Sequence, residues 1–316
     1  MKSPFLLGGI ASRWLNQRVA SLVYTPETLP PVFSGKKRYG VVGDPVAHSL
    51  SPSMQEAGFA ALGISAEYFR VEVPAGGLSA ALPRLHAAGF LGWNCTLPHK
   101  ESMFSLCEET DESARESSTV NTVTVTAGKL RGSSTDAGGW EDAVAEAWKL
   151  DLSSQRILLL GCGGVGRTLA FRLAKRGCRQ LTLANRSPGK AAPLVEELRR
   201  LHGTPVALVP WESAGLVAAA RVSDLVVHAT KLGLAEGDPL PLPENSWHAG
   251  LRIYDTVYRQ DYTPLVRLAR SRGLPAVDGL GMLLHQGARA LSLWTGQKAP
   301  IRAMRTALEK SAGRPL

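Results

Sequence analysis

Hydrophobic and polar positions along residues 37–310 predict strands that alternate with helices. Short apolar runs are typical of buried strands, and apolar residues three or four positions apart are typical of helices. The predicted strands are 38–42, 67–71, 90–95, 156–160, 180–184, 206–209, 224–228 and 252–254. The predicted helices are 54–62, 78–88, 138–148, 164–176, 191–201, 282–294 and 301–310. This alternation favours an α/β protein with parallel strands and crossover helices.

Two segments depart from the alternation. Residues 120–126 and 130–134 are both β-rich, and Ala127-Gly128-Lys129 between them predicts an antiparallel hairpin. Residues 1–36 have no clean period and end in a turn-rich run, so we interpret them as an N-terminal extension. Two structures stay open for residues 10–23, a disordered segment or a short amphipathic helix that packs on the core or on a partner.

The chain has 316 residues, about twice the usual length of a domain, so we expect two domains. Its 44% hydrophobic and 20% charged content is typical of a folded globular protein. No uncharged apolar run reaches the roughly 18 residues of a membrane span, and the apolar patch at 5–11 lacks a convincing cleavage site. We therefore expect a cytoplasmic protein that does not bind membranes. The 4 cysteines form no CxxC pair, so we predict neither a metal site nor a disulfide framework.

The formal charge of +9 raises the possibility of nucleic-acid binding, but the charge is concentrated in one place. Residues 152–195 contain eight basic residues and no acid: Arg156, Arg167, Arg172, Lys175, Arg176, Arg179, Arg186 and Lys190. Such a stretch is either a solvated helix face or an anion site. Because the charge is local, we expect no nucleic-acid partner.

A glycine-rich turn lies inside this basic stretch. The strand 156–160 leads into Gly161-Cys-Gly-Gly-Val-Gly166, and an amphipathic helix follows. Glycines at the first, third and sixth positions let backbone amides approach a pyrophosphate, beside the positive end of the helix dipole. The alternative is a purely structural turn. The strand–turn–helix context favours a dinucleotide site formed by Gly161, Gly163, Gly164, Val165 and Gly166.

The end of the next strand indicates which dinucleotide binds. An NAD site usually places Asp or Glu about 20 residues after the first glycine, where it accepts from ribose hydroxyls. Here the strand leads into Asn185, Arg186 and Ser187, with Lys190 close behind. Cationic side chains suit a 2′-phosphate, which a carboxylate would repel. The sequence therefore predicts NADP.

Upstream polar residues suggest small-anion chemistry, although each also has a simpler interpretation. Ser49 and Ser51 lie in a loop between a strand and a helix, where ligands collect or where a helix merely begins. Lys100 follows a strand end that carries Asn94 and Thr96, but a single lysine is usually a surface charge. Asp136 precedes a helix and could only cap it.

Taken together, these motifs resemble the shikimate dehydrogenase family over residues 37–316. The motifs that carry the resemblance, in order, are HSLSP (48–52), NCTLPHK (94–100), STVNT (118–122), STDAGG (134–139), GCGGVG (161–166), ANRS (184–187), YDTVY (254–258), GMLLHQ (281–286) and WTG (294–296). The resemblance implies reversible NADPH-dependent reduction of 3-dehydroshikimate to shikimate, on the pathway to chorismate and the aromatic amino acids. It also implies a discontinuous substrate domain (37–137 and 280–316) and a Rossmann-like NADP-binding domain (138–279).

The resemblance implies roles for individual residues. Lys100 and Asp136 match the catalytic pair of the family. Reducing a ketone builds negative charge on its oxygen, which needs a positioned cation or proton donor, and a lysine can be both. Ser49 and Ser51 match the hydroxyls that hold the substrate carboxylate. Further substrate-side matches are Asn94, Thr96, Asn121, Tyr258 and Gln286. Further cofactor-side matches are Asn185, Arg186, Ser187, Lys190, Thr230, Gly279 and Met282.

Several positions depart from the family pattern. Ser134 stands where asparagine is usual, Cys95 where valine is usual, and His228 where asparagine is usual, with Lys231 nearby. Two alternatives stay open: an NAD-dependent quinate enzyme, against which Arg186 and Lys190 speak, and a non-catalytic dinucleotide-binding regulator, against which the catalytic pair speaks. We expect a small-molecule substrate and a monomer or homodimer.

Overall fold

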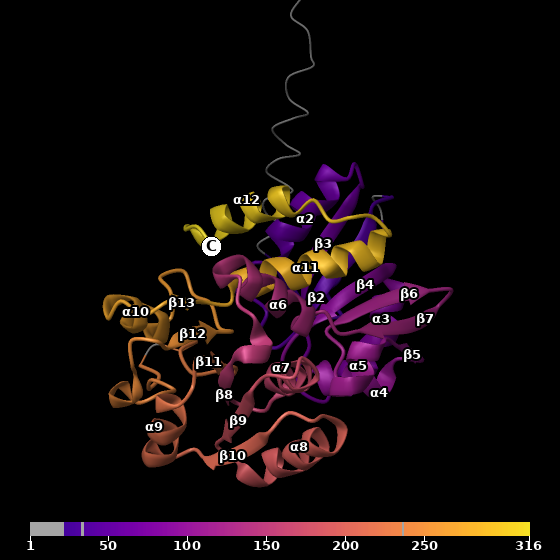
Figure 1. Ribbon diagram of the computed structural model, residues 1–316. Helices are drawn as coiled ribbons and strands as arrows, with labels where there is room; N and C mark the ends of the chain where they lie inside the picture. The colour runs from indigo at the N-terminus through magenta and orange to yellow at the C-terminus, as the bar shows by residue number, and fades with distance from the viewer. Residues whose placement is uncertain (1–21, 33–34, 236) are drawn as a thin grey trace, which may run out of the picture. The chain divides into compact units, whose positions relative to one another are not determined.

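The computed structural model describes residues 22–32, 35–235 and 237–316, which form two compact units (Figure 1). Unit 1 comprises the described part of residues 1–135 together with Gly287–Ser311. Unit 2 comprises Asp136–Gln286 and Ala312–Leu316. Residues 10–21, for which two structures stayed open, lie outside the described part. None of the described helices is long and apolar enough to cross a membrane.

Unit 1 is built on a seven-stranded sheet in the order β1-β3-β2-β4-β6-β7-β5. Its strands are β1 (Val23–Tyr24), β2 (Lys37–Gly43), β3 (Ala66–Glu72), β4 (Phe90–Cys95), β5 (Glu109–Thr110), β6 (Thr122–Thr126) and β7 (Lys129–Ser133). Strand β6 is antiparallel to both neighbours, and the other pairs are parallel. The hairpin between β6 and β7 turns at Ala127 and Gly128, whose φ angles of 50° and 77° suit a tight two-residue turn.

Six helices accompany this sheet, α11 only with its second half. They are α2 (Ser51–Ala61), α3 (Leu78–Ala87), α4 (Lys100–Leu106), α5 (Glu112–Ser117), α11 (Leu280–Thr295) and α12 (Ile301–Ala312). The second half of α11 packs on the sheet through Trp294, whose ring lies 4.9 Å from that of Tyr39. Its indole N–H donates to the carbonyl of Val123 at 2.9 Å. A side chain at Gly92 would collide with this indole, with its Cβ 2.5 Å from the indole nitrogen.

Unit 2 has a six-stranded, fully parallel sheet in the order β10-β9-β8-β11-β12-β13. The strands are β8 (Arg156–Leu160), β9 (Gln180–Asn185), β10 (Val206–Pro210), β11 (Leu225–His228), β12 (Arg252–Asp255) and β13 (Ala276–Val277). The helices are α6 (Asp136–Trp148), α7 (Gly164–Lys175), α8 (Pro188–Leu201), α9 (Ser213–Arg221), α10 (Pro264–Ser271) and the start of α11, with short 3-10 turns at Leu152–Ser154 and Glu244–Ser246. This strand order is that of a Rossmann-like fold, as predicted.

The last five residues join unit 2 because Arg314 fixes them there. Its guanidinium lies over the ring of Tyr262, 3.8 Å from the centroid, and pairs with the buried carboxylate of Asp278. The units therefore divide at residues 135/136, 286/287 and 311/312, whereas the family resemblance implied divisions at 137/138 and 279/280.

Candidate active site

The glycine-rich turn of unit 2 has the geometry that a dinucleotide site requires. Gly161 has a φ of +101°, which favours glycine, and a side chain at Gly166 would place its Cβ 2.0 Å from the carbonyl of Gly161. By contrast, a Cβ added at Gly163 would meet no atom within 4 Å. Gly163 directly precedes α7, so this open space lies at the helix N-terminus, where a pyrophosphate fits.

The side chain of Asn185 connects the end of β9 to this turn. Its Oδ1 accepts from the amide of Cys162 at 3.2 Å, and its Nδ2 donates to the carbonyl of Ser187 at 2.9 Å. Burial raises the pKa of the Cys162 thiol to about 11, so no thiolate adds negative charge here near neutral pH. Asn185 therefore positions the segment that carries Arg186 and Ser187.

Four of the eight basic residues in the stretch at 152–195 pair with acids from elsewhere in unit 2. These ion pairs are Arg156–Asp224, Arg167–Glu197, Arg172–Glu141 and Arg176–Glu141. Arg186 and Lys190 are exposed, and neither forms an ion pair with a described residue. Both follow the carboxyl end of β9, on the same side of the sheet as the glycine-rich turn, and so remain candidates for a phosphate contact.

Thr230 lies beside the first glycine of the turn. A Cβ added at Gly161 would lie 2.7 Å from Thr230 Cγ2 and 2.7 Å from the carbonyl oxygen of Ala229. The loop after β11 therefore packs directly on the glycine-rich turn. His228, the last residue of β11, is fully buried and its Nε2 lies 2.5 Å from the Thr230 hydroxyl.

In unit 1, the loops that follow β2 and β4 lie against one another. The Thr96 amide donates to the carbonyl of Val42 at 2.9 Å, and the Asp44 amide donates to the carbonyl of Leu97 at 2.8 Å. A Cβ at Gly43 would lie 2.3 Å from Thr96 Cγ2, so the close approach requires glycine. The structure thus brings the Ser49 loop and the loop leading to Lys100 to one edge of the sheet.

A buried tyrosine that the sequence patterns did not single out links two predicted substrate residues. Tyr68 reaches across β2, and its hydroxyl donates to Asn94 Oδ1 at 2.8 Å. Burial raises the pKa of Tyr68 well above its usual range, and an interaction with the Ser51 side chain opposes this rise only in part, so the hydroxyl stays protonated and can donate. The Asn94 amide nitrogen donates to Asn121 O at 3.1 Å and to Thr122 Oγ1 at 3.0 Å.

Two further interactions fix the loops of unit 1. Arg70 donates from Nε and Nη2 to the carbonyl of Ser49, at 3.1 and 2.6 Å. Asn121 accepts from the amide of Thr135 at 2.8 Å and donates to its hydroxyl at 2.9 Å. Asn94 and Asn121, which lie in different loops, therefore belong to one hydrogen-bond network with Tyr68, Thr122 and Thr135.

Lys100 and Asp136 begin helices in different units. Lys100 starts α4, and its carbonyl accepts from the amide of Val120 at 2.9 Å. Asp136 starts α6 and is 3% exposed. Within unit 2, α6 approaches α11 closely, because a Cβ at Gly139 would lie 2.4 Å from the amide nitrogen of Gln286. The helix that begins with Asp136 therefore packs directly against Gln286.

The remaining predicted residues also belong to unit 2. Gly279 allows a tight turn, since its Cβ would lie 2.2 Å from the carbonyl of Thr256. Met282 is 6% exposed and packs in the main hydrophobic cluster of the unit, whereas Tyr258 is half-buried. His99 is buried and hydrogen-bonds the carbonyl of Val73 at 2.7 Å, which is a structural position.

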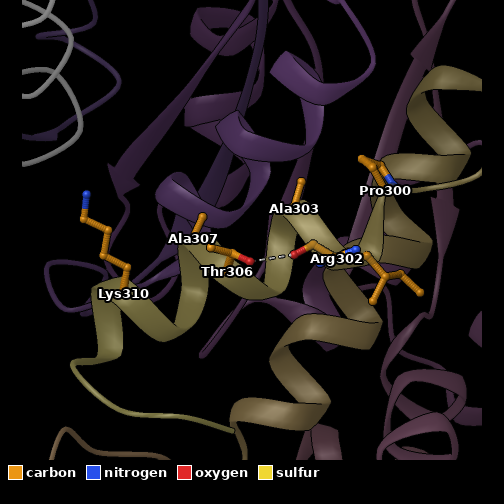
Figure 2. A pocket seen from close by; sticks show the side chains of 7 residues that line it. Pro300, Arg302, Ala303, Thr306, Ala307 and Lys310 are labelled. Carbon is orange, nitrogen blue, oxygen red and sulfur yellow. Dashed lines mark hydrogen bonds between the residues drawn. The ribbon is translucent and has the colours of Figure 1, made fainter.

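Two surface grooves of the described chain lie away from these residues. One runs along α12 and is lined by Pro300, Ile301, Arg302, Ala303, Thr306, Ala307 and Lys310 (Figure 2). The Thr306 hydroxyl there donates to the carbonyl of Arg302 at 3.1 Å, within the helix (Figure 2). The other is formed by residues 174–179 and 201–205, at the amino end of β9. Neither contains a predicted site residue.

Family models cover much of the chain. Residues 41–123 match the shikimate dehydrogenase substrate binding domain, residues 143–232 match shikimate / quinate 5-dehydrogenase, and residues 279–309 match the shikimate 5'-dehydrogenase C-terminal domain. A shikimate dehydrogenase (NADP(+)) of Rubrobacter xylanophilus is 44% identical over 283 residues, which are 89% of this chain and 98% of the relative.

Solved structures show the same relationship. Shikimate 5-dehydrogenase from Thermus thermophilus, in complex with NADP(H) and shikimate, has a TM-score of 0.77 and 35% identity, covering 87% of this chain and 99% of that one. Quinate dehydrogenase from Corynebacterium glutamicum, in complex with NAD, has a TM-score of 0.78 and 28% identity, with 87% and 99% coverage.

Proposed function

The chain belongs to the shikimate dehydrogenase family, and we propose that it catalyses the reversible NADPH-dependent reduction of 3-dehydroshikimate to shikimate. It is an oxidoreductase that acts on a CH–OH group and uses NADP. One observation from the structure carries the proposal: the open space in front of Gly163 suits a dinucleotide, and two exposed cations that form no ion pair with a described residue follow the neighbouring strand, where a 2′-phosphate would be held. The sequence relationship to NADP-dependent relatives supports the same cofactor.

Most of the proposed substrate-binding residues belong to unit 1, whereas Tyr258, Gln286 and all of the proposed cofactor-binding residues belong to unit 2. Ser49 and Ser51 supply hydroxyl donors to the substrate carboxylate, and Asn94 and Asn121 organise the surrounding network. In unit 2, the amides of the glycine-rich turn hold the pyrophosphate, and Arg186 with Lys190 holds the 2′-phosphate. The connected hydrogen bonds of the Ser51 and Asn94 loops support this division.

The chemistry requires one positioned proton donor. When bound, NADPH supplies the hydride. Lys100 stabilises the negative charge that develops on the ketone oxygen and gives it a proton, and it accepts the alcohol proton in the reverse direction. Asp136 orients the lysine. Each residue is the first residue of a helix, so the helix fixes the position of its Cα atom.

The test is absorbance at the nicotinamide band with four substrate and cofactor combinations. Shikimate and quinate are each compared with NADP and NAD, against buffer. We expect the highest kcat/KM with shikimate and NADP. Preference for quinate with NAD would instead favour the second candidate, to which the structural similarity to quinate dehydrogenase points. No turnover with any pair would favour a dinucleotide-binding regulator.

Assembly and location are part of the proposal. We propose a cytoplasmic enzyme that acts as a monomer or homodimer on small molecules and binds neither nucleic acid nor membranes. The ion pairs that neutralise Arg156, Arg167, Arg172 and Arg176 support the absence of a general nucleic-acid surface. Light scattering of the purified chain measures its oligomeric state.

A further inference from the structure

Unit 2 contains a buried chain of polar side chains behind the dinucleotide turn. Strand register places His228 of β11 directly beside Asp255 of β12. His228 Nδ1 lies 2.8 Å from Asp255 Oδ1, and its Nε2 lies 2.5 Å from the Thr230 hydroxyl. His228 and Asp255 are 0% and 1% exposed. A carboxylate, an imidazole and a hydroxyl are thus hydrogen-bonded in a row.

The surroundings of Asp255 determine which atoms donate. Its Oδ1 also accepts from the amide of Val257 at 3.0 Å, and its Oδ2 accepts from the hydroxyl of Thr263 at 2.7 Å. Because a carboxylate only accepts, His228 must donate to it from Nδ1. With Nδ1 donating, Nε2 of the neutral imidazole accepts, and the Thr230 hydroxyl donates to it.

This arrangement fixes Thr230 on both sides. While its hydroxyl donates to His228, its oxygen accepts from the amide of Leu232 at 3.1 Å. Its methyl group faces Gly161, as the 2.7 Å approach to an added Cβ shows. The loop after β11 is otherwise exposed or half-buried from Thr230 to Leu234 except at Gly233, so few apolar contacts hold it.

We propose that His228, oriented by Asp255, is a positioning residue that holds Thr230 and its loop against the glycine-rich turn, so that the turn is preorganised for the dinucleotide. The inference rests on the proposed binding of NADP. His228 does not touch the cofactor in this arrangement and acts through Thr230. The simpler interpretation, a satisfied core histidine, predicts an effect on stability alone.

The test is a double-mutant cycle on the affinity of the whole chain for NADP+, measured by calorimetry without substrate. His228→Asn retains an N–H donor for Asp255 but is too short to reach Thr230. Thr230→Val replaces the hydroxyl by a methyl group of similar size and so removes the hydrogen bonds of Thr230 without shortening its side chain. We expect each single variant to weaken binding roughly three- to tenfold, the range of one hydrogen bond. In the Thr230→Val background, His228→Asn should change the affinity by less than about twofold, because the interaction through which it acts is already lost.

A matched control separates positioning from stability. Ser223 is 2% exposed near the opposite end of β11, and its hydroxyl donates to the carbonyl of Ala219 at 2.8 Å. Ser223→Ala should lower the thermal midpoint about as much as His228→Asn and leave NADP+ affinity unchanged. If His228→Asn does not fold, Thr230→Val still tests the loop, because Thr230 is half-buried.

Three results would overturn the inference: unchanged affinity in Thr230→Val, unchanged affinity in His228→Asn, or additive effects in the double variant. Failure of the wild-type chain to bind NADP+ would instead refute the proposed function. The two failures are therefore distinguishable in one set of titrations.

Discussion

Removing the hydroxyl of Tyr68 should both destabilise unit 1 and weaken substrate binding. Tyr68 is 0% exposed, and its hydroxyl is the hydrogen-bond donor to Asn94 Oδ1. Tyr68→Phe leaves that oxygen without this donor while Asn94 is only 6% exposed. An unsatisfied buried polar group costs about 1–3 kcal/mol. For a unit of this size, each kcal/mol lowers the thermal midpoint by roughly 2–4 °C.

A neighbouring tyrosine provides the control. Tyr39 lies beside Tyr68 in the strand register and is 3% exposed, but its ring stacks on Phe59, and its hydroxyl makes no side-chain hydrogen bond within the described chain. Tyr39→Phe should therefore change the free energy of unfolding by less than about 0.5 kcal/mol. Both variants delete one oxygen from the same sheet, so the difference between them isolates the hydrogen bonds.

Tyr68→Phe should also raise the KM for shikimate more than it lowers kcat. Asn94, a proposed substrate-binding residue, loses its hydrogen-bond donor in Tyr68→Phe, and the Ser51 side chain loses its interaction with the hydroxyl. Urea unfolding of the ligand-free chain and steady-state kinetics measure the two effects. If Tyr68→Phe behaves like Tyr39→Phe in both assays, the hydroxyl has no role in organising the substrate loops.

Three further substitutions test the proposed roles. Lys100→Ala should lower kcat by roughly 10²- to 10⁴-fold with shikimate affinity largely retained; a variant with more than half of wild-type turnover would exclude Lys100 from the mechanism. Ser51→Ala should weaken shikimate binding by roughly 10- to 150-fold, the range of one charge-assisted hydrogen bond, and calorimetry should find NADP affinity unchanged. Arg186→Ala should lower kcat/KM for NADP about tenfold and for NAD less than twofold, and the loss should be smaller at high salt. Arg200→Ala, at another exposed arginine of unit 2, serves as the control. Equal losses for both cofactors would refute the 2′-phosphate contact.

Long strands and helices were predictable because each carries its own hydrophobic pattern. Strand β8 has five residues, and Ile157 to Leu160 are at most 1% exposed. Short elements gave no comparable signal. Helix α4 buries only Met103, so no period could emerge from its seven residues. Helix α10 was missed although the sequence signals it, because Leu265, Val266 and Ala269 form an apolar face at helical spacing, Thr263 caps the helix and Pro264 begins it.

Local motifs predicted which chemical groups occur at the site, but they did not predict which distant residues form hydrogen bonds with those groups. Tyr68 is 26 residues from Asn94, and His228 is 27 residues from Asp255. Each pair meets because parallel strands align in a particular register across the sheet. Register depends on the packing of whole strands and crossover helices, which no short motif records.

Charge shows most clearly why proximity along the chain differs from proximity in space. The acid-free stretch at 152–195 suggested a continuous positive surface, yet four of its arginines pair with Asp224, Glu197 and Glu141, which all lie outside the stretch. Lys175 and Arg179 lie at the amino end of the sheet, opposite the glycine-rich turn. Of the eight basic residues, only Arg186 and Lys190 both follow the carboxyl end of a strand, where the glycine-rich turn lies, and form no ion pair with a described residue. We therefore expect selectivity for a 2′-phosphate to depend on these two residues, because four of the other six basic residues of the stretch form ion pairs within unit 2.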